Sequence, residues 1–125
     1  PVPLVKIMFE DDHEYLTALR DYVLQQAWSE NYEIFFSDRT LLEVTRKGAS
    51  KGAMVARLAQ RLGISPAHIY CAGDENNDLS MLAMAAEGFA PANCVETVRN
   101  CGATIVADCD HDTLAEIIAI LDRRY

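Results

Sequence analysis

The sequence predicts an α/β protein in which a parallel sheet is covered by helices on both faces. Two observations lead to this fold class. Predicted strands and helices alternate along the chain, and strands such as 69–72 and 103–107 are continuous apolar runs. Parallel strands that are buried on both faces have this composition. The chain has 125 residues, half of them hydrophobic, which is enough for one modest domain with its own core.

The N-terminal part of the chain predicts a β-α-β-β unit. Residues 2–9 read as a strand, and residues 12–28 as a helix with apolar side chains at helical spacing and acidic residues in its first turn. Residues 32–36 and 40–45 are two further predicted strands. We expect a turn at 37–39 between them, which explains the serine there as a hairpin residue.

A polar, glycine-containing segment at 46–50 separates this unit from the rest of the chain. Ser50 is the predicted N-cap of a helix, and Gly63 is its predicted C-cap. The other expected elements are a helical turn from Ser65, strands at 69–72, 88–90 and 103–107, and helices from residue 79 to about Glu87, at 94–101 and at 112–124.

The segment Gly73–Asp78 carries the strongest chemical signal. It places three carboxylates and two amides directly after a buried strand, at the edge where parallel sheets bind ligands. Clustered carboxylates repel one another unless a cation lies among them, and ligands of oxygen alone suit Mg²⁺. Asp74 and Asp78 are four residues apart and would face the same way in a helical turn. The alternative is a helix N-terminus with acidic residues, which explains one or two of the three.

Lys51 is the second candidate residue. It stands at the start of a predicted helix, where a cation opposes the helix dipole. An anion bound at that helix end would account for it, because the lysine and the backbone N–H groups would point at the same ligand. The alternative is a solvated lysine with no ligand.

These residues together resemble the haloacid dehalogenase (HAD) superfamily. Lys51-Gly52 is followed, twenty-three positions after the lysine, by Asp74 within Gly73-Asp74-x-x-Asn77-Asp78. The pattern is similar to the Cof-type branch of sugar-phosphate phosphatases and to the sucrose-phosphate phosphatases. The resemblance runs from about Leu42 to the C-terminus and includes Asn93, which follows the strand after the acidic loop.

The resemblance implies an organisation and a chemistry. Residues 46–125 would be the C-terminal part of a Rossmann-like HAD core, and residues 1–45 would be part of a cap inserted into that core. The family transfers a phosphoryl group to an aspartate and then hydrolyses the aspartyl phosphate, with Mg²⁺ as cofactor. Such chemistry is mostly positioning and charge neutralisation.

The resemblance also implies a role for each site residue. Asp74 would be a magnesium ligand, and Asp78 would support the metal shell. Lys51 would neutralise the nucleophile and the transferring phosphoryl group. Asn77 would contact the phosphate or the substrate.

The chain departs from the family pattern in one respect. The nucleophilic Asp-x-Asp motif, which in the family ends the first strand of the core, is not found, nor is the Ser or Thr that ends the second. We therefore expect the chain to be the C-terminal half of a longer phosphatase and to be inactive alone. Asp108-Cys109-Asp110 also follows an apolar strand, but lies downstream of Asp74, where a loop and a helix cap at Asp112 explain the acids. An enzyme that uses Asp110 or Asp112 as nucleophile is a rival interpretation.

Composition limits the partners. A net charge of −8 argues against nucleic acid and anionic membranes, which require basic surface. The expected ligand is a small phosphorylated metabolite such as a sugar phosphate, with Arg39 a candidate contact. The four cysteines show no metal-binding or disulfide spacing, and no signal peptide is evident, so we expect a reducing cytoplasm. The alternative function is a non-catalytic fragment that binds phosphate or cation, or forms a homodimer through an exposed sheet edge.

Overall fold

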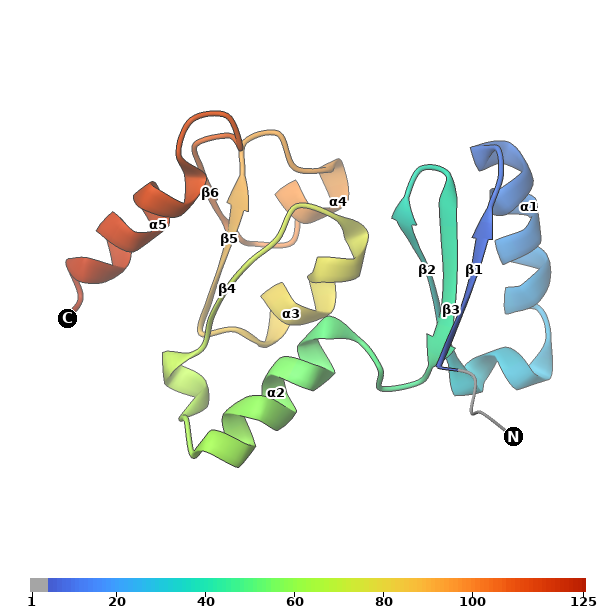
Figure 1. Cartoon of the computed structure of the whole chain (residues 1–125), viewed down its shortest axis with the longest axis horizontal. Coiled ribbons are helices and arrows are strands. Elements are labelled where there is room, and N and C mark those ends of the chain that lie inside the picture. Colours follow the sequence, from blue (N-terminus) through green and yellow to red (C-terminus); the bar gives the residue numbers. More distant parts are fainter. Residues whose placement is uncertain (1–4) are drawn as a thin grey trace.

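The chain forms two separate β-sheets, each with its own helices (Figure 1). This computed structural model describes residues 5–125. In chain order the elements are β1 (Lys6–Glu10), α1 (His13–Leu24), the 3₁₀ helix η1 (Ala27–Asn31), β2 (Tyr32–Asp38), β3 (Leu41–Arg46), α2 (Lys51–Leu62), η2 (Pro66–His68), β4 (Tyr70–Ala72), η3 (Asn76–Asp78), α3 (Leu79–Met84), β5 (Glu87–Pro91), α4 (Glu96–Arg99), β6 (Thr104–Val106) and α5 (Thr113–Asp122). The chain passes from the first sheet to the second between β3 and α2.

The first sheet is antiparallel, with β3 between β1 and β2. Helix α1 packs against one face of it, where Leu16 and Leu42 are almost fully buried. Successive side chains of a strand point to opposite faces, so Glu43 and Thr45 lie on the face away from α1. That face is turned toward the second sheet and its helices, and β2 lies against η3 (Figure 1).

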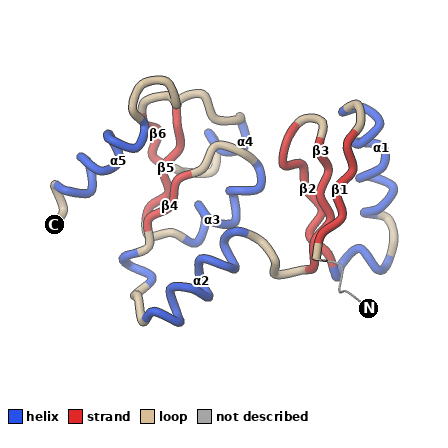
Figure 2. The backbone as a smooth tube through the Cα atoms, in the orientation of Figure 1, coloured by secondary structure: helices blue, strands red, loops and turns tan. Residues whose placement is uncertain are grey.

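The second sheet is parallel, in the order β4-β5-β6, and helices cover both of its faces (Figure 2). On one face Ala90 of β5 packs in a core with Leu82 of α3 and Val98 of α4. On the other face its neighbour Phe89 packs with Ile117 of α5. This arrangement confirms the predicted α/β fold with a parallel sheet and flanking helices.

The predicted helix at 12–28 is too long. Helix α1 ends at Leu24, because Gln26 adopts an extended backbone conformation (φ −82°, ψ 133°) and a separate 3₁₀ helix follows. Within that helix the ring of Trp28 meets the ring of Tyr32 edge-on, with the centroids 5.8 Å apart. An aromatic contact with the start of β2 is a tertiary preference that helical spacing alone does not predict.

The predicted turn at 37–39 is displaced. Strand β2 continues through Ser37 to Asp38, with an irregularity in its register between Phe36 and Asp38. The side chain of Asp38 then accepts hydrogen bonds from the backbone N–H and the hydroxyl of Thr40. Such an aspartate turn reverses the chain two residues later than expected, so Ser37 is a strand residue.

Other boundaries differ by a few residues. The helix expected to reach about Glu87 ends at Met84, because Ala85 is extended and the N–H of Ala86 already donates to the carbonyl of Ile69. The short helix expected at 94–101 covers Glu96–Arg99. The strand expected at 2–9 runs from Lys6 to Glu10, and its first predicted residues lie outside the described part of the chain.

Strand β4 forms one edge of the parallel sheet. The carbonyl of Ile69 and the N–H of Gly73 both face β5. Backbone groups alternate in direction along a strand, so those of Tyr70 and Ala72 face away from β5. Within residues 5–125, no helix has the length and apolar character needed to cross a membrane.

Candidate active site

Asp78 organises the acidic loop that follows β4. Asp78 is 4 % exposed. Its Oδ2 accepts hydrogen bonds from the backbone N–H groups of Asp74 (3.0 Å) and Glu75 (3.2 Å). A carboxylate that is removed from water must have such partners. The loop therefore closes around its own last acidic residue.

Gly73 makes room for this carboxylate. A Cβ atom at Gly73 would lie 2.3 Å from the Cβ and 2.8 Å from the Oδ2 of Asp78. The backbone at the end of β4 thus passes directly beside the Asp78 side chain, and only a residue without a side chain fits. This steric requirement explains why a glycine ends the apolar strand.

Lys51 reaches the same carboxylate from the first residue of α2. Its Nζ donates to Oδ1 of Asp78 at 2.5 Å and to Oδ1 of Asn77 at 3.2 Å. The Asp78 side chain is 5 % exposed and that of Lys51 is 50 % exposed. The ammonium group is therefore held by a buried anion, while half of the lysine side chain remains exposed.

The helix N-terminus that carries Lys51 is fixed locally and by packing. The hydroxyl of Ser50 accepts from the N–H of Ala53, as predicted for an N-cap. The N–H of Gly52 donates to Oγ of Ser80 at 3.1 Å, and a Cβ at Gly52 would lie 2.2 Å from the carbonyl oxygen of Ser80. Helix α2 thus lies against the start of α3, which brings Lys51 beside the loop.

The side chain of Asp74, unlike its backbone N–H, is not bonded to this cluster. Its backbone carbonyl accepts from the N–H of Val95, while among residues 5–125 no hydrogen bond is recorded to its exposed carboxylate. It lines a hollow of about 490 Å³ together with Asp110 and Asp112. The acids after β6, which the sequence interpretation set aside, are therefore neighbours of Asp74 across this hollow.

The described residues fit part of a magnesium site. No group of three or more histidine, cysteine or acidic side chains able to hold a metal occurs within residues 5–125. Proteins often bind Mg²⁺ through one or two carboxylates, with water and phosphate oxygens completing the shell. The exposed carboxylate of Asp74 suits that arrangement. Both oxygens of Asp78 have partners in the protein, which suits the predicted supporting role; the roles of all four site residues stay predictions.

Two further features of this region had no predicted role, although the resemblance includes Asn93. Asn93 accepts through Oδ1 from the N–H of Cys109, which ties the loop after β5 to the loop after β6. The polar side chains of Glu43 and Thr45 line a cleft that also contains Lys51 and Asn77. Alternation of these residues with Leu42 and Val44 was the available signal, because it indicates a strand with one polar face.

Comparison with protein families identifies the family of this chain. The model of the haloacid dehalogenase-like hydrolases matches residues 2–118. The chain belongs to this family, in agreement with the resemblance seen in the sequence.

Two curated relatives and one solved structure illustrate this similarity. The chain is 38 % identical over 93 residues to YxeH of Bacillus subtilis, and this region covers 74 % of the chain and 34 % of YxeH. It is 38 % identical over 92 residues to the HMP-PP phosphatase of Cronobacter sakazakii, again 74 % of this chain and 34 % of the relative. A solved haloacid dehalogenase-like hydrolase from B. subtilis matches with a TM-score of 0.82 and 27 % identity, over 92 % of this chain and 40 % of that one. The chain thus spans about a third of the length of these curated relatives.

Proposed function

We propose that the chain contributes the lysine and acidic-loop part of a magnesium-dependent phosphatase site that acts on a small phosphorylated metabolite. The observation that carries this proposal is the ammonium of Lys51, on a half-exposed side chain, hydrogen-bonded to both Asp78 and Asn77. This ion pair lies at the carboxyl end of a parallel strand, where α/β proteins bind ligands. Membership of the haloacid dehalogenase-like hydrolases supports the reaction class.

The proposed reaction has two steps. A carboxylate oxygen of an aspartate attacks phosphorus and the bond to the leaving alcohol breaks; water then hydrolyses the aspartyl phosphate and releases inorganic phosphate. Magnesium held by Asp74 would offset the charge of the phosphoryl oxygens. Lys51 would bind the same oxygens with its ammonium group, and Asn77 would donate a hydrogen bond to them. Asp78 would keep Lys51 and the loop in position.

We place the nucleophilic aspartate outside these residues. Asp108, Asp110 and Asp112 follow β6, and β5 separates β6 from β4. The outward backbone groups of β4 leave room for another strand next to the acidic loop, and an aspartate at the end of such a strand would lie near Asp74.

Phosphate binding tests the proposed site in the chain as it stands. Amide resonances are followed by NMR while inorganic phosphate is added in the presence of Mg²⁺. We expect the signals of residues 51–52 and 74–78 to shift, and the shifts to disappear in Lys51→Met. The matched control is Lys47→Met, since Lys47 is bonded to the carbonyl of Glu30 away from the site. Equal binding by both variants would contradict the proposal.

Turnover tests the source of the nucleophile. We expect the chain not to release phosphate from p-nitrophenyl phosphate above the background of its Asp74→Asn variant. Hydrolysis that Asp74→Asn abolishes, together with trapping of beryllium fluoride on Asp110 or Asp112, would place the nucleophile within this chain instead.

The edge position of β4 favours a second candidate function, self-association into a homodimer by strand pairing. Light scattering distinguishes a monomer from a homodimer, and a strictly monomeric, well-folded chain would exclude this second function.

All four cysteines are free thiols, which supports a reducing cytoplasm as the proposed location.

A further inference from the structure

Strand β1 is an edge of the first sheet, and its apolar side chains are exposed. Among residues 5–125, β3 is the only strand that pairs with it. Ile7, Met8 and Phe9 are 44 %, 54 % and 37 % exposed. An apolar edge strand of this kind is a template on which another strand can pair.

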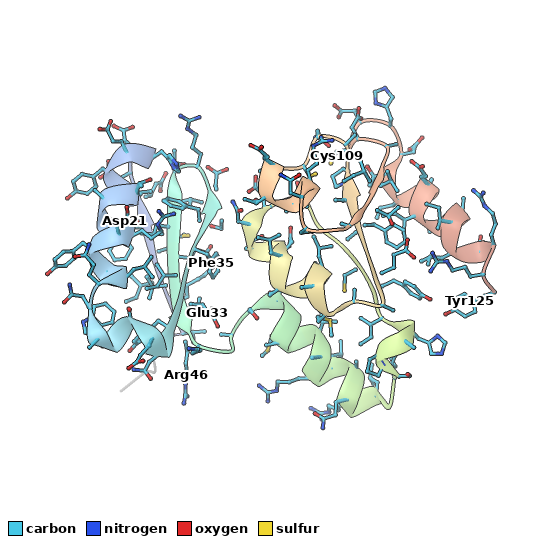
Figure 3. The ribbon with its side chains drawn as sticks, turned by 180° about the vertical axis from the view of Figure 1, so that it is seen from behind. Asp21, Glu33, Phe35, Arg46, Cys109 and Tyr125 are labelled. Carbon is cyan, nitrogen blue, oxygen red and sulfur yellow. The ribbon has the colours of Figure 1, made fainter. Side chains whose placement is uncertain are left out.

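The two faces of β1 have different neighbours. Ile7 and Phe9 are opposite the buried β3 residues under α1, but α1 packs mainly on β2 and β3 and leaves them partly uncovered. Met8 lies on the other face, which it shares with Phe35. Figure 3 shows Phe35 turned toward the second sheet and its helices, whereas Asp21 lies on α1 at the opposite side. Apolar side chains of β1 are therefore exposed on both faces of the sheet.

The outward backbone groups of β1 belong to three residues. The N–H of Asp11 donates to the carbonyl of Thr40 at 3.3 Å, and this pair extends the register between β1 and β3 by one residue. Backbone groups alternate in direction along a strand. Those of Lys6, Met8 and Glu10 therefore face away from β3 and are available to a further strand.

The sequence of β1, Lys6-Ile7-Met8-Phe9-Glu10, is complementary to itself in an antiparallel pair. A pair of copies centred on Met8 uses all three outward residues of each strand. It places Lys6 opposite Glu10 of the second copy at both ends, and Ile7 opposite Phe9. Opposite charges and apolar side chains that face each other across two strands stabilise a sheet. A register centred on Ile7 or Phe9 would use only two outward residues per strand and would place a charge opposite Met8.

We propose that two copies of the chain associate through β1, antiparallel and centred on Met8. The contact is the same on both copies, so it closes as a dimer, and two sheets of three strands become one sheet of six. Nζ of Lys6 bonds to Glu43 of its own sheet, but nearly half of the lysine side chain is exposed and can face Glu10 of the second copy.

The position of β1 keeps this contact away from the proposed phosphate site. Strand β2, at the opposite edge of the first sheet, is the one that lies against η3. The proposed dimer also differs from the second candidate function, which pairs β4 of the other sheet. It therefore stands or fails independently of the phosphatase proposal.

Sedimentation velocity of the 125-residue chain, from about 10 µM to 1 mM, measures the association. Two five-residue strands form a small interface, so we expect a dissociation constant of roughly 10–100 µM. A chain that stays monomeric at every concentration would overturn the inference.

Hydrogen exchange followed by NMR identifies the edge that pairs. The amide hydrogens of Ile7 and Phe9 face β3 and should be protected at every concentration. Those of Lys6, Met8 and Glu10 should exchange fast in dilute solution and several-fold more slowly when most of the chain is dimeric. Protection that appears on β4 instead would overturn the inference, and this measurement needs no variant.

Two substitutions test the register. Met8→Lys places two ammonium groups opposite each other at the centre, and Glu10→Lys places a lysine opposite Lys6 at both ends; each should weaken the association about tenfold or more. The matched control is Asp122→Lys at an exposed position of α5, which changes the net charge as much as Glu10→Lys and should not weaken it. Met8 and Glu10 are exposed, so both variants should keep the Tm of the parent in dilute solution.

The outcomes separate this dimer from other modes of association. A dimer that is as stable in Met8→Lys and Glu10→Lys as in the parent forms through another surface, such as β4, and overturns the inference. Lys51→Met should abolish phosphate binding and leave the dimer unchanged, so the failure of one proposal is distinguishable from the failure of the other.

Discussion

Nζ of Lys51 and Oδ1 of Asp78 lie 2.5 Å apart although 27 residues separate them in the sequence. The Asp78 side chain is buried and the Lys51 side chain is half exposed. A buried carboxylate requires charge compensation and hydrogen bonds, and Asp78 obtains both, from Lys51 and from the N–H groups of its own loop. One aspartate thus sets the shape of the acidic loop and the direction of the lysine.

Replacement of Asp78 by asparagine should weaken the fold. The amide has nearly the same shape but lacks the charge, and its single acceptor oxygen can serve either the two loop N–H groups or Lys51, not both. We expect the free energy of unfolding to fall by about 1–3 kcal/mol. Urea denaturation measures this change. The control Asp122→Asn, at an exposed position on α5, should stay within about 0.5 kcal/mol of the parent; equal values for both variants would contradict the role of Asp78.

Gly52→Ala should destabilise the protein, against the usual helix preference. Alanine normally stabilises a helix by about 1 kcal/mol relative to glycine. Here its Cβ would lie 2.2 Å from the backbone oxygen of Ser80, and such crowding costs about 1–3 kcal/mol. Thermal unfolding should show a lower Tm. Ala56→Gly, at an exposed position of the same helix, should also lower the Tm through propensity alone. A higher Tm for Gly52→Ala would show that α2 and α3 are not in close contact.

The cysteines should differ in reactivity. Burial raises the pKa of the Cys71 thiol above its ordinary value of 9.0, so little thiolate exists at neutral pH. Cys94 is also buried, while Cys101 and Cys109 are exposed. We expect iodoacetamide to modify Cys101 and Cys109 first, and all four only after unfolding in urea. Mass spectrometry of tryptic peptides identifies the sites, and early labelling of Cys71 would contradict the packing of β4.

The Asp108 carboxyl should titrate below its ordinary pKa of 3.8. The hydrogen bond from His111 is the main cause of the lowered pKa, and the N–H of Asp110 contributes. A lowered carboxyl pKa stabilises the fold above the ordinary value and ceases to do so as the pH falls through the folded-state value. Because the pair is exposed, the effect on stability should be small. NMR titration should show the Asp108 pKa rising in His111→Ala, and an unchanged Asp108 pKa would contradict this role of the His111 hydrogen bond.

Several features were predictable because their causes are local. The spacing of apolar residues indicated the strands and helices between α2 and α5, and the hydroxyl of Ser50 caps α2 as its position predicted. The structure brings Lys51, Asn77 and Asp78 together, and the roles that the family resemblance implies for them stay predictions. The prediction that the first helix continues through Trp28 was wrong, because Gln26 is extended and the indole packs on Tyr32. The turn predicted at 37–39 begins later than expected, because Ser37 is still in β2 and the side chain of Asp38 makes a turn with Thr40.

The sequence by itself determined the fold class, the acidic loop and the lysine, because strand composition, helix caps and motif spacing are properties of neighbouring residues. Only the tertiary structure decided how the carboxylates divide their roles. Asp78 is buried under Gly73 and bound to Lys51, while Asp74 is exposed beside Asp110 and Asp112. It also decided that Glu43 and Thr45 face Lys51 across a cleft. Burial and partners of this kind depend on how two sheets pack, which no local pattern specifies.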